Sequence, residues 1–159
     1  MEAVYIMIEY IESMLKAFQN TMLLSAVTAW ASAEVLKMII RFFRGKRGFS
    51  ELWGSGGMPS AHSATVGALA MSVGLRYGFD GAAFAIAAVL ALVVMYDASG
   101  VRKEAGKHAV AINELKEMLT PQEGNAHKKY KESIGHTKPQ VIAGAAWGMI
   151  VAILFYIVR

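Results

Sequence analysis

One short segment of this sequence combines the residue types needed to bind an anion and to move a proton. The segment Gly56-Gly57-Met58-Pro59-Ser60-Ala61-His62 is typical of a glycine-rich turn that leads into a helix. Pro59 suits the first helical turn, and the free backbone N–H groups that follow it attract negative charge. Ser60 adds a hydroxyl donor, and a histidine such as His62 can donate a proton near neutral pH. The segment predicts a phosphate-binding helix start, although an ordinary helix cap would use the same residues.

Further cations and a second histidine adjoin other apolar stretches. Arg44 follows Lys37 by seven residues, so both side chains point the same way on a helix. Glu34 can pair with Lys37, which would explain a charge in an apolar helix without any function. Arg102 suits bidentate binding of phosphate, although an arginine at a helix end is more often an interface anchor. With His136, this set predicts chemistry on a phosphate ester: cations hold the oxygens, one histidine attacks phosphorus and the other protonates the alcohol.

The sequence offers no metal or nucleotide motif. It has no cysteine, which excludes disulfides and thiolate metal sites. We find no metal triad with sensible spacing, no Walker-type loop and no Gly-x-Ser-x-Gly elbow. His108 and His127 adjoin lysines and are expected to face solvent. We therefore expect neither a metal nor a cofactor.

These residues are carried by a very apolar chain. Of its 159 residues, 55% are hydrophobic and 18% charged, and the mean hydropathy is +0.40, which is too apolar for an ordinary soluble domain. No signal peptide is expected, because the first ten residues lack a basic start. Apolar stretches that are long enough to cross a bilayer predict about four transmembrane helices, over residues 20–43, 59–77, 82–99 and 139–158. The predicted fold class is all-α, a single membrane-embedded helical bundle with amphipathic helices added.

Other segments complete this organisation. Residues 3–17 carry an apolar stripe that predicts an amphipathic helix, lying at the membrane interface or against the bundle. The third span is expected to continue as helix towards Leu119, and residues 44–58 and 120–138 are expected to be loops. Gly144 and Gly148 have the small-xxx-small spacing of close helix contacts. A homodimer is one expected assembly, with these two glycines as a candidate contact.

The basic residues divide unequally between the two ends of this bundle. Lys16, Arg76 and Arg159 fall on one side. The other side holds the candidate site and these residues: Arg41, Arg44, Lys46, Arg47, Arg102, Lys103, Lys107, Lys116, Lys128, Lys129, Lys131 and Lys138. The positive-inside rule therefore predicts an integral protein of the cell membrane whose active-site face is cytoplasmic.

Two longer strings resemble a known superfamily. The run Gly-Ser-Gly-Gly-Met-Pro-Ser-Ala-His-Ser-Ala-Thr at residues 54–65 and the run Val-Met-Tyr-Asp-Ala-Ser-Gly-Val-Arg at residues 94–102 resemble a branch of the type 2 phosphatidic acid phosphatases. This is the divergent, small bacterial and plant branch of the superfamily that shares its active site with vanadium haloperoxidases. With Gly135-His136-Thr137 and the last span, the resemblance covers roughly residues 30–155.

The resemblance assigns roles to residues of the first two motifs. Lys37 and Arg44 match a lysine, six residues, an arginine and a proline, with Gly45 replacing the proline. Pro59-Ser60-Ala61-His62 matches Pro-Ser-Gly-His, with alanine replacing the glycine. The resemblance implies that Lys37, Arg44 and Ser60 bind phosphate and that His62 is the general acid.

The third motif is altered. Arg102 corresponds to its arginine, whereas the nucleophilic histidine would be His136, 34 positions later. Gln140 stands where an aspartate would orient that histidine. A glutamine oxygen can accept a hydrogen bond from imidazole but cannot stabilise an imidazolium by charge. Asp97 could supply the carboxylate if the fold brought it to His136, so either residue is a candidate.

The resemblance implies a metal-independent membrane phosphatase that hydrolyses a lipid phosphate or pyrophosphate. The expected partners are this substrate and membrane lipids, with no nucleic acid. The alternative is a lipid-phosphate binding or transport protein that retains the anion site without efficient hydrolysis. A purely structural membrane subunit would have no affinity for anions.

Overall fold

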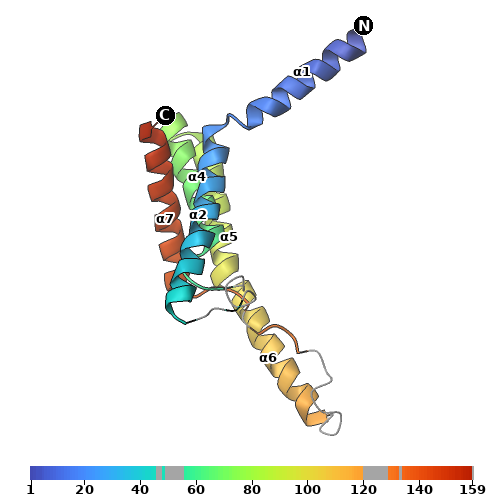
Figure 1. Cartoon of the computed structure of the whole chain (residues 1–159), viewed down its shortest axis with the longest axis vertical. Helices are drawn as coiled ribbons and strands as arrows, with labels where there is room; N and C mark the ends of the chain where they lie inside the picture. Colours follow the sequence, from blue (N-terminus) through green and yellow to red (C-terminus); the bar gives the residue numbers. More distant parts are fainter. Residues whose placement is uncertain (46–47, 49–55, 120–128, 133, 159) are drawn as a thin grey trace.

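The computed structural model describes residues 1–45, 48, 56–119, 129–132 and 134–158, and every regular element in these ranges is an α-helix. The bundle consists of α2 (Thr21–Phe43), α4 (Ala61–Tyr77), α5 (Ala82–Ser99) and α7 (Lys138–Val158), while α1 (Glu2–Ala17) and α6 (Val101–Leu119) extend from its two ends (Figure 1). These helices confirm the predicted all-α membrane bundle.

Local sequence accounts for where the bundle helices begin and end. The side-chain oxygen of Asn20 accepts hydrogen bonds from two backbone N–H groups in the first turn of α2. Ser60 caps α4 in the same way, and such caps each stabilise a helix by about 1 kcal/mol. Gly78, with φ of 91°, ends α4 in a conformation that an L side chain rarely adopts. Consecutive bundle helices run in opposite directions (Figure 1).

Helix α4 lies at the centre of the bundle, in contact with α2, α5 and α7. The buried residues around it are small: Ala29, Ala33, Ala61, Ala64 and Ala68 belong to one cluster. Small side chains let helix backbones approach closely, which favours association in a membrane, where burial of apolar surface gives little driving force. Packing at the centre therefore rests on backbone proximity rather than on large apolar side chains.

The closest approach is between α4 and α7. A methyl group on Gly144 would overlap the backbone of Ser60, and one on Gly148 would overlap the carbonyl group of Ala64. Both glycines are buried inside the chain. They were expected as a candidate dimer contact; within this chain α4 occupies their surface, and a homodimer stays a prediction.

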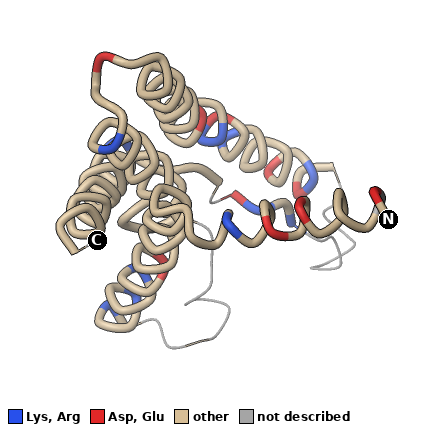
Figure 2. The backbone as a smooth tube through the Cα atoms, turned by 90° about the horizontal axis from the view of Figure 1, so that it is seen from above, with Lys and Arg blue, Asp and Glu red and all other residues tan. Residues whose placement is uncertain are grey.

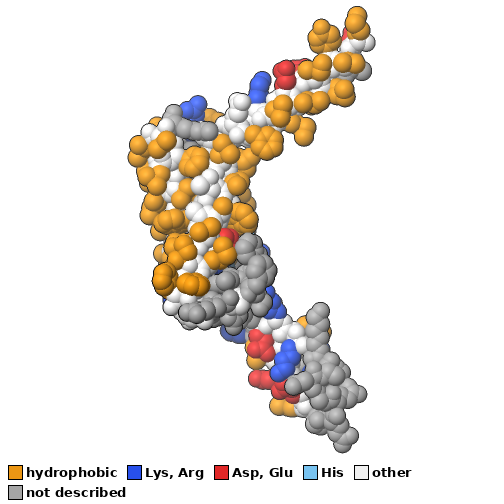
Figure 3. Space-filling view, viewed as in Figure 1, with side chains coloured by type: hydrophobic (Ala, Val, Ile, Leu, Met, Phe, Trp, Pro, Cys, Tyr) orange, Lys and Arg blue, Asp and Glu red, His pale blue; other side chains and the backbone are white. Residues whose placement is uncertain are grey.

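The surface of the bundle suits a membrane. Within the described part of the chain, three segments are long and apolar enough to cross a bilayer: Thr21–Phe43, Ala82–Leu119 and Lys138–Val158. Helix α4 has 17 residues, which at 1.5 Å per residue gives about 26 Å, near the lower limit for a span. Apolar side chains cover most of the visible face of the bundle, whereas charged side chains gather on α6 and a few stand among the apolar ones of α1 (Figure 3). The bundle is therefore a membrane domain, and four crossings stay a prediction.

Helix α1 does not take one of its two expected positions, the one against the bundle. It forms over Glu2–Ala17, close to the predicted bounds, but it runs outward from the bundle (Figures 1 and 2). The side chains of α1 whose exposure is described are all exposed. Packing against the bundle is thus not observed, and a position at the membrane interface stays a prediction.

Helix α6 continues the direction of α5 beyond Gly100, as predicted from the sequence. The chain returns along α6, where the side chain of Asn113 donates to the carbonyl oxygen of Tyr130 and accepts from its backbone N–H, each at 2.9 Å. Asn113 also donates to the carboxylate of Glu132 at 2.8 Å. These contacts carry the chain back to the base of the bundle, just before α7.

Parts of two predicted loops lie outside the described residues. From the segment 44–58 these are residues 46–47 and 49–55, and from the segment 120–138 they are residues 120–128 and 133. Lys46, Arg47, His127 and Lys128 are among them, and Arg159 also lies outside the described residues.

The contact between α4 and α7 gives a stability prediction. We expect Gly148→Ala to lower the apparent Tm of the purified protein by about 5 °C or more, because overpacking typically costs about 1–3 kcal/mol. The better helix propensity of alanine returns at most about 1 kcal/mol. Thermal unfolding in detergent measures this. Ala146→Val enlarges an exposed residue of the same helix and serves as the control with an unchanged Tm. Equal Tm values for Gly148→Ala and the natural protein would contradict the close packing.

Candidate functional site

The described segments meet in a cavity of about 340 Å³ at the end of the bundle where α2 ends and α7 begins. The segment before α4, the start of α6 and residues 134–137 complete its walls. Its lining residues are Lys37, Ile40, Arg41, Arg44, Gly56, Gly57, Met58, Lys103, Ile134, Gly135, His136, Thr137 and Gln140. Four of these side chains are cations and one is a histidine, so the cavity suits an anion.

Helix α2 supplies three of the cations from one face. Lys37, Arg41 and Arg44 are four and three residues apart, which places them one above another on a helix. Lys37 is 5% exposed, and its ammonium group lies 2.7 Å from a carboxylate oxygen of Glu34. A buried ammonium is costly unless it is paired. Glu34 therefore stabilises Lys37, which lines the cavity.

Two glycines let the backbone lie against these cations. Gly56 and Gly57 have φ of 82° and 99°, conformations that favour glycine. Arg41 donates a hydrogen bond to the carbonyl oxygen of Gly56. A Cβ on Gly57 would lie only 3.1 Å from Nη2 of Arg41 and 3.2 Å from Cγ of Lys37. Because the two glycines before Met58-Pro59 have no side chains, their backbone can form one wall of the cavity.

His136 is held by both its backbone and its ring. Its N–H donates to the carbonyl oxygen of Ala98 at 2.9 Å, which ties the segment to the end of α5. Its Nδ1 lies 3.1 Å from Oε1 of Gln140, and the backbone N–H of Thr137 donates to the same oxygen at 3.1 Å. Because a backbone N–H requires an acceptor, this side-chain atom of Gln140 is the oxygen. In neutral His136, Nδ1 then carries the proton and Nε2 does not.

The surroundings of His136 also favour its neutral form. Burial lowers the pKa of the imidazole, and the nearby charges of Lys37 and His62 lower it further. The hydrogen bond to Gln140 and one with the backbone of Gly57 oppose this effect, but the net shift is below the ordinary value of 6.5. A neutral imidazole at neutral pH is the form required of a nucleophile.

The structure places Ser60 and His62 differently from the residues that line the cavity. Ser60 is fully buried, and its hydroxyl oxygen accepts from the backbone N–H of Ser63 at 3.4 Å and from its hydroxyl at 3.0 Å. The backbone N–H of Ser60 donates to the carbonyl oxygen of Gln140 at 3.0 Å. His62 is exposed in the first turn of α4. Ser60 therefore joins α4 to α7, and the described wall contains neither of these residues.

Asp97 and Arg102 pair with each other instead of with the histidine. Nε of Arg102 lies 2.7 Å from Oδ2 of Asp97, and both side chains are partly exposed outside the cavity lining. Of the two candidates to orient His136, the structure brings Gln140 into contact. The cation that α6 contributes to the lining is Lys103.

Sequence reasoning assigned no role to two lining cations. Arg41 could have been found from its spacing, because it lies one helical turn after Lys37. No signal marked Lys103, because the helical phase changes where Gly100 separates α5 from α6. Within the described segments, no three histidine, aspartate or glutamate side chains group as a metal site would require.

Comparison with known proteins identifies the family of this chain. Residues 18–151 match the family described as the Divergent PAP2 family. The chain is also 36% identical over 147 residues to a Bacillus subtilis (strain 168) protein described as "Uncharacterized membrane protein YuiD". That alignment covers 85% of this chain and 93% of the relative. No solved structure matches the chain. The match over most of the sequence shows that the protein belongs to the divergent PAP2 family.

Proposed function

We propose that this protein is a membrane phosphatase that hydrolyses a lipid phosphate or pyrophosphate without a metal. One observation carries the proposal: His136, oriented through Nδ1 by Gln140, lines the same cavity as Lys37, Arg41, Arg44 and Lys103. Fixed cations around a reacting phosphoryl group stabilise the charge that develops in the transition state. Membership of the divergent PAP2 family agrees with this chemistry.

In the proposed mechanism, Nε2 of His136 attacks phosphorus while the cations bind the phosphoryl oxygens. The P–O bond to the lipid alcohol or to the second phosphate breaks. His62, exposed outside the described wall but close enough for its charge to act on His136, protonates the departing oxygen. Water then attacks the phosphohistidine, His62 accepts the proton of this water, and phosphate leaves. His136 returns to its neutral form, with its Nδ1 proton still donated to Gln140.

Gln140 determines how efficient this reaction would be. Its side chain accepts from the backbone N–H of Thr137, half of the capping box that starts α7, as well as from His136. A neutral amide orients the imidazole but does not stabilise the positive charge that develops on it. This observation favours a second candidate, a lipid-phosphate binding or transport protein with slow or no hydrolysis.

We also propose that the cavity opens to the cytoplasm. The cavity cations, together with Lys107, Lys116, Lys129 and Lys131, are on the end of the bundle that carries most basic residues. The positive-inside rule supports this orientation. The substrate phosphate would then be presented from the inner leaflet.

Phosphate release tests the proposed reaction. Purified protein with a chelator should release phosphate from phosphatidic acid, phosphatidylglycerol phosphate or polyprenyl pyrophosphate. We expect His136→Ala and His62→Ala each to reduce kcat by about a hundredfold or more, because a nucleophile or general acid is lost. His108→Ala, which removes an exposed histidine of α6, is the matched control. Turnover that survives both site substitutions would rule out the mechanism, whereas tight phosphate binding without turnover would support the binding protein.

A pair of neighbouring substitutions tests which cations hold the substrate. We expect Lys103→Gln to raise KM or the Kd for phosphate about tenfold, because Lys103 lines the cavity. Arg102→Gln should change either value less than threefold, since its guanidinium group is paired with Asp97 outside the lining. Titration of phosphate or vanadate measures both variants, and the reverse order of effects would contradict the assignment.

The lowered pKa of His136 gives a pH prediction. Neutral His136 persists below pH 6.5, so the acid limb of kcat/KM should lie below that pH, where the pH passes through the lowered pKa. Gln140→Glu keeps a capping acceptor and adds a negative charge, which raises the pKa of His136 and moves the loss of activity to higher pH. A pH–rate profile of both proteins checks this. An acid limb above 6.5 in the natural protein, or one unmoved by Gln140→Glu, would be inconsistent with His136 as the nucleophile.

A further inference from the structure

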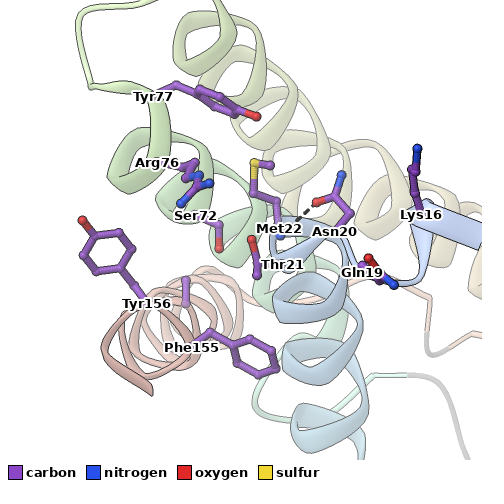
Figure 4. A pocket seen from close by; sticks show the side chains of 11 residues that line it. Lys16, Gln19, Asn20, Thr21, Met22, Ser72, Arg76, Tyr77, Phe155 and Tyr156 are labelled. Carbon is purple, nitrogen blue, oxygen red and sulfur yellow. Dashed lines mark hydrogen bonds between the residues drawn. The ribbon is translucent and has the colours of Figure 1, made fainter. Parts of the chain in front are cut away.

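A second and larger cavity, of about 820 Å³, lies at the other end of the bundle. It opens where α1 joins α2, and the ends of α4 and α7 form its remaining walls (Figure 4). The proposed phosphatase mechanism makes no use of it. Its size is within the range of about 300–1,000 Å³ that is typical of small-molecule sites.

The polar part of this cavity is positively charged. Arg76 lies on the α4 side and Lys16 on the α1 side, with Asn20 and Met22 between them (Figure 4). No carboxylate is among the lining residues that the structure describes, and neither cation forms an ion pair within those ranges. The oxygen of Asn20 is used by the first turn of α2, which leaves its NH₂ group as a donor. The cavity therefore offers positive charge and hydrogen-bond donors, which suits an anionic group.

The other part of the cavity is apolar. Met22, Ala152 and Phe155 line it, and Phe155 packs against the buried cluster of the bundle. Tyr77 and Tyr156, both exposed, stand at the ends of α4 and α7. Tyrosines at the ends of membrane helices are typical of the boundary between headgroups and acyl chains. A soluble anion would not need the apolar wall, whereas an amphipathic lipid uses both parts.

We infer that this cavity binds the headgroup of an anionic phospholipid from the leaflet opposite the candidate phosphatase site. The guanidinium group of Arg76 binds the phosphate, and the ammonium group of Lys16 adds a second positive charge at the rim. The first carbons of the acyl chains lie against Met22 and Phe155. Lys16 belongs to α1, which does not pack against the bundle, so the bound lipid would also link α1 to the bundle.

Photolabelling in a bilayer tests this inference. The whole protein is reconstituted in nanodiscs with a trace of phosphatidylglycerol that carries a diazirine close to its headgroup, and labelled peptides are mapped by mass spectrometry. We expect labels concentrated on residues 19–22 and on Ala152, Phe155 and Tyr156, which line the cavity. Arg76→Gln should reduce this labelling about tenfold, through the loss of charge-assisted hydrogen bonds.

Two further variants separate lipid binding from folding and from general charge. Lys16 lies on a helix outside the bundle, so Lys16→Gln cannot disturb the packing of the bundle. This variant should reduce labelling about threefold. Lys107→Gln removes an equal charge from exposed α6 and should leave labelling unchanged. Equal labelling by a phosphatidylcholine that carries the same diazirine would overturn the inference. Unchanged labelling in both Arg76→Gln and Lys16→Gln would overturn it as well. Loss of labelling on addition of free glycerol phosphate would instead indicate a site for a soluble anion and would also overturn it.

Discussion

The close contact between α4 and α7 is the constraint on which the candidate site depends. Gly144 and Gly148 allow the backbone of α7 to touch α4, and the N–H of Ser60 donates to the carbonyl oxygen of Gln140 at 3.0 Å. This hydrogen bond joins the start of one helix to the start of the other. It fixes the segment that contains Gly56 and Gly57 relative to His136, although about 80 residues separate them in the sequence.

The second constraint is electrostatic. Four cations around one cavity repel one another, and one of them, Lys37, is buried. Its ion pair with Glu34 offsets much of the cost of burial. Burial and the charge of Lys37 both keep His136 neutral. The cavity can therefore bind an anion and hold an uncharged nucleophile beside it, two requirements that depend on the same positive charge.

Gln140 joins helix structure to the candidate chemistry. Its oxygen accepts from the N–H of Thr137 at the start of α7 and also from the ring of His136. The residue that caps the start of the helix therefore also orients the imidazole. The absence of a charge at this position is the physical reason that binding without rapid hydrolysis remains the competing function.

The sequence by itself determined the membrane bundle and most of the helix bounds, because long apolar stretches and capping residues such as Asn20 act locally. It also indicated Lys37, Arg44 and His136, which the cavity brings together. It could not choose between Asp97 and Gln140, because that depends on which side chain meets His136 after the chain returns along α6. Nor could it show that Ser60 is committed to a cap, that Lys103 rather than Arg102 lines the cavity, or that Gly144 and Gly148 face α4. Only the tertiary structure decided these points, because each depends on contacts between helices far apart in the chain.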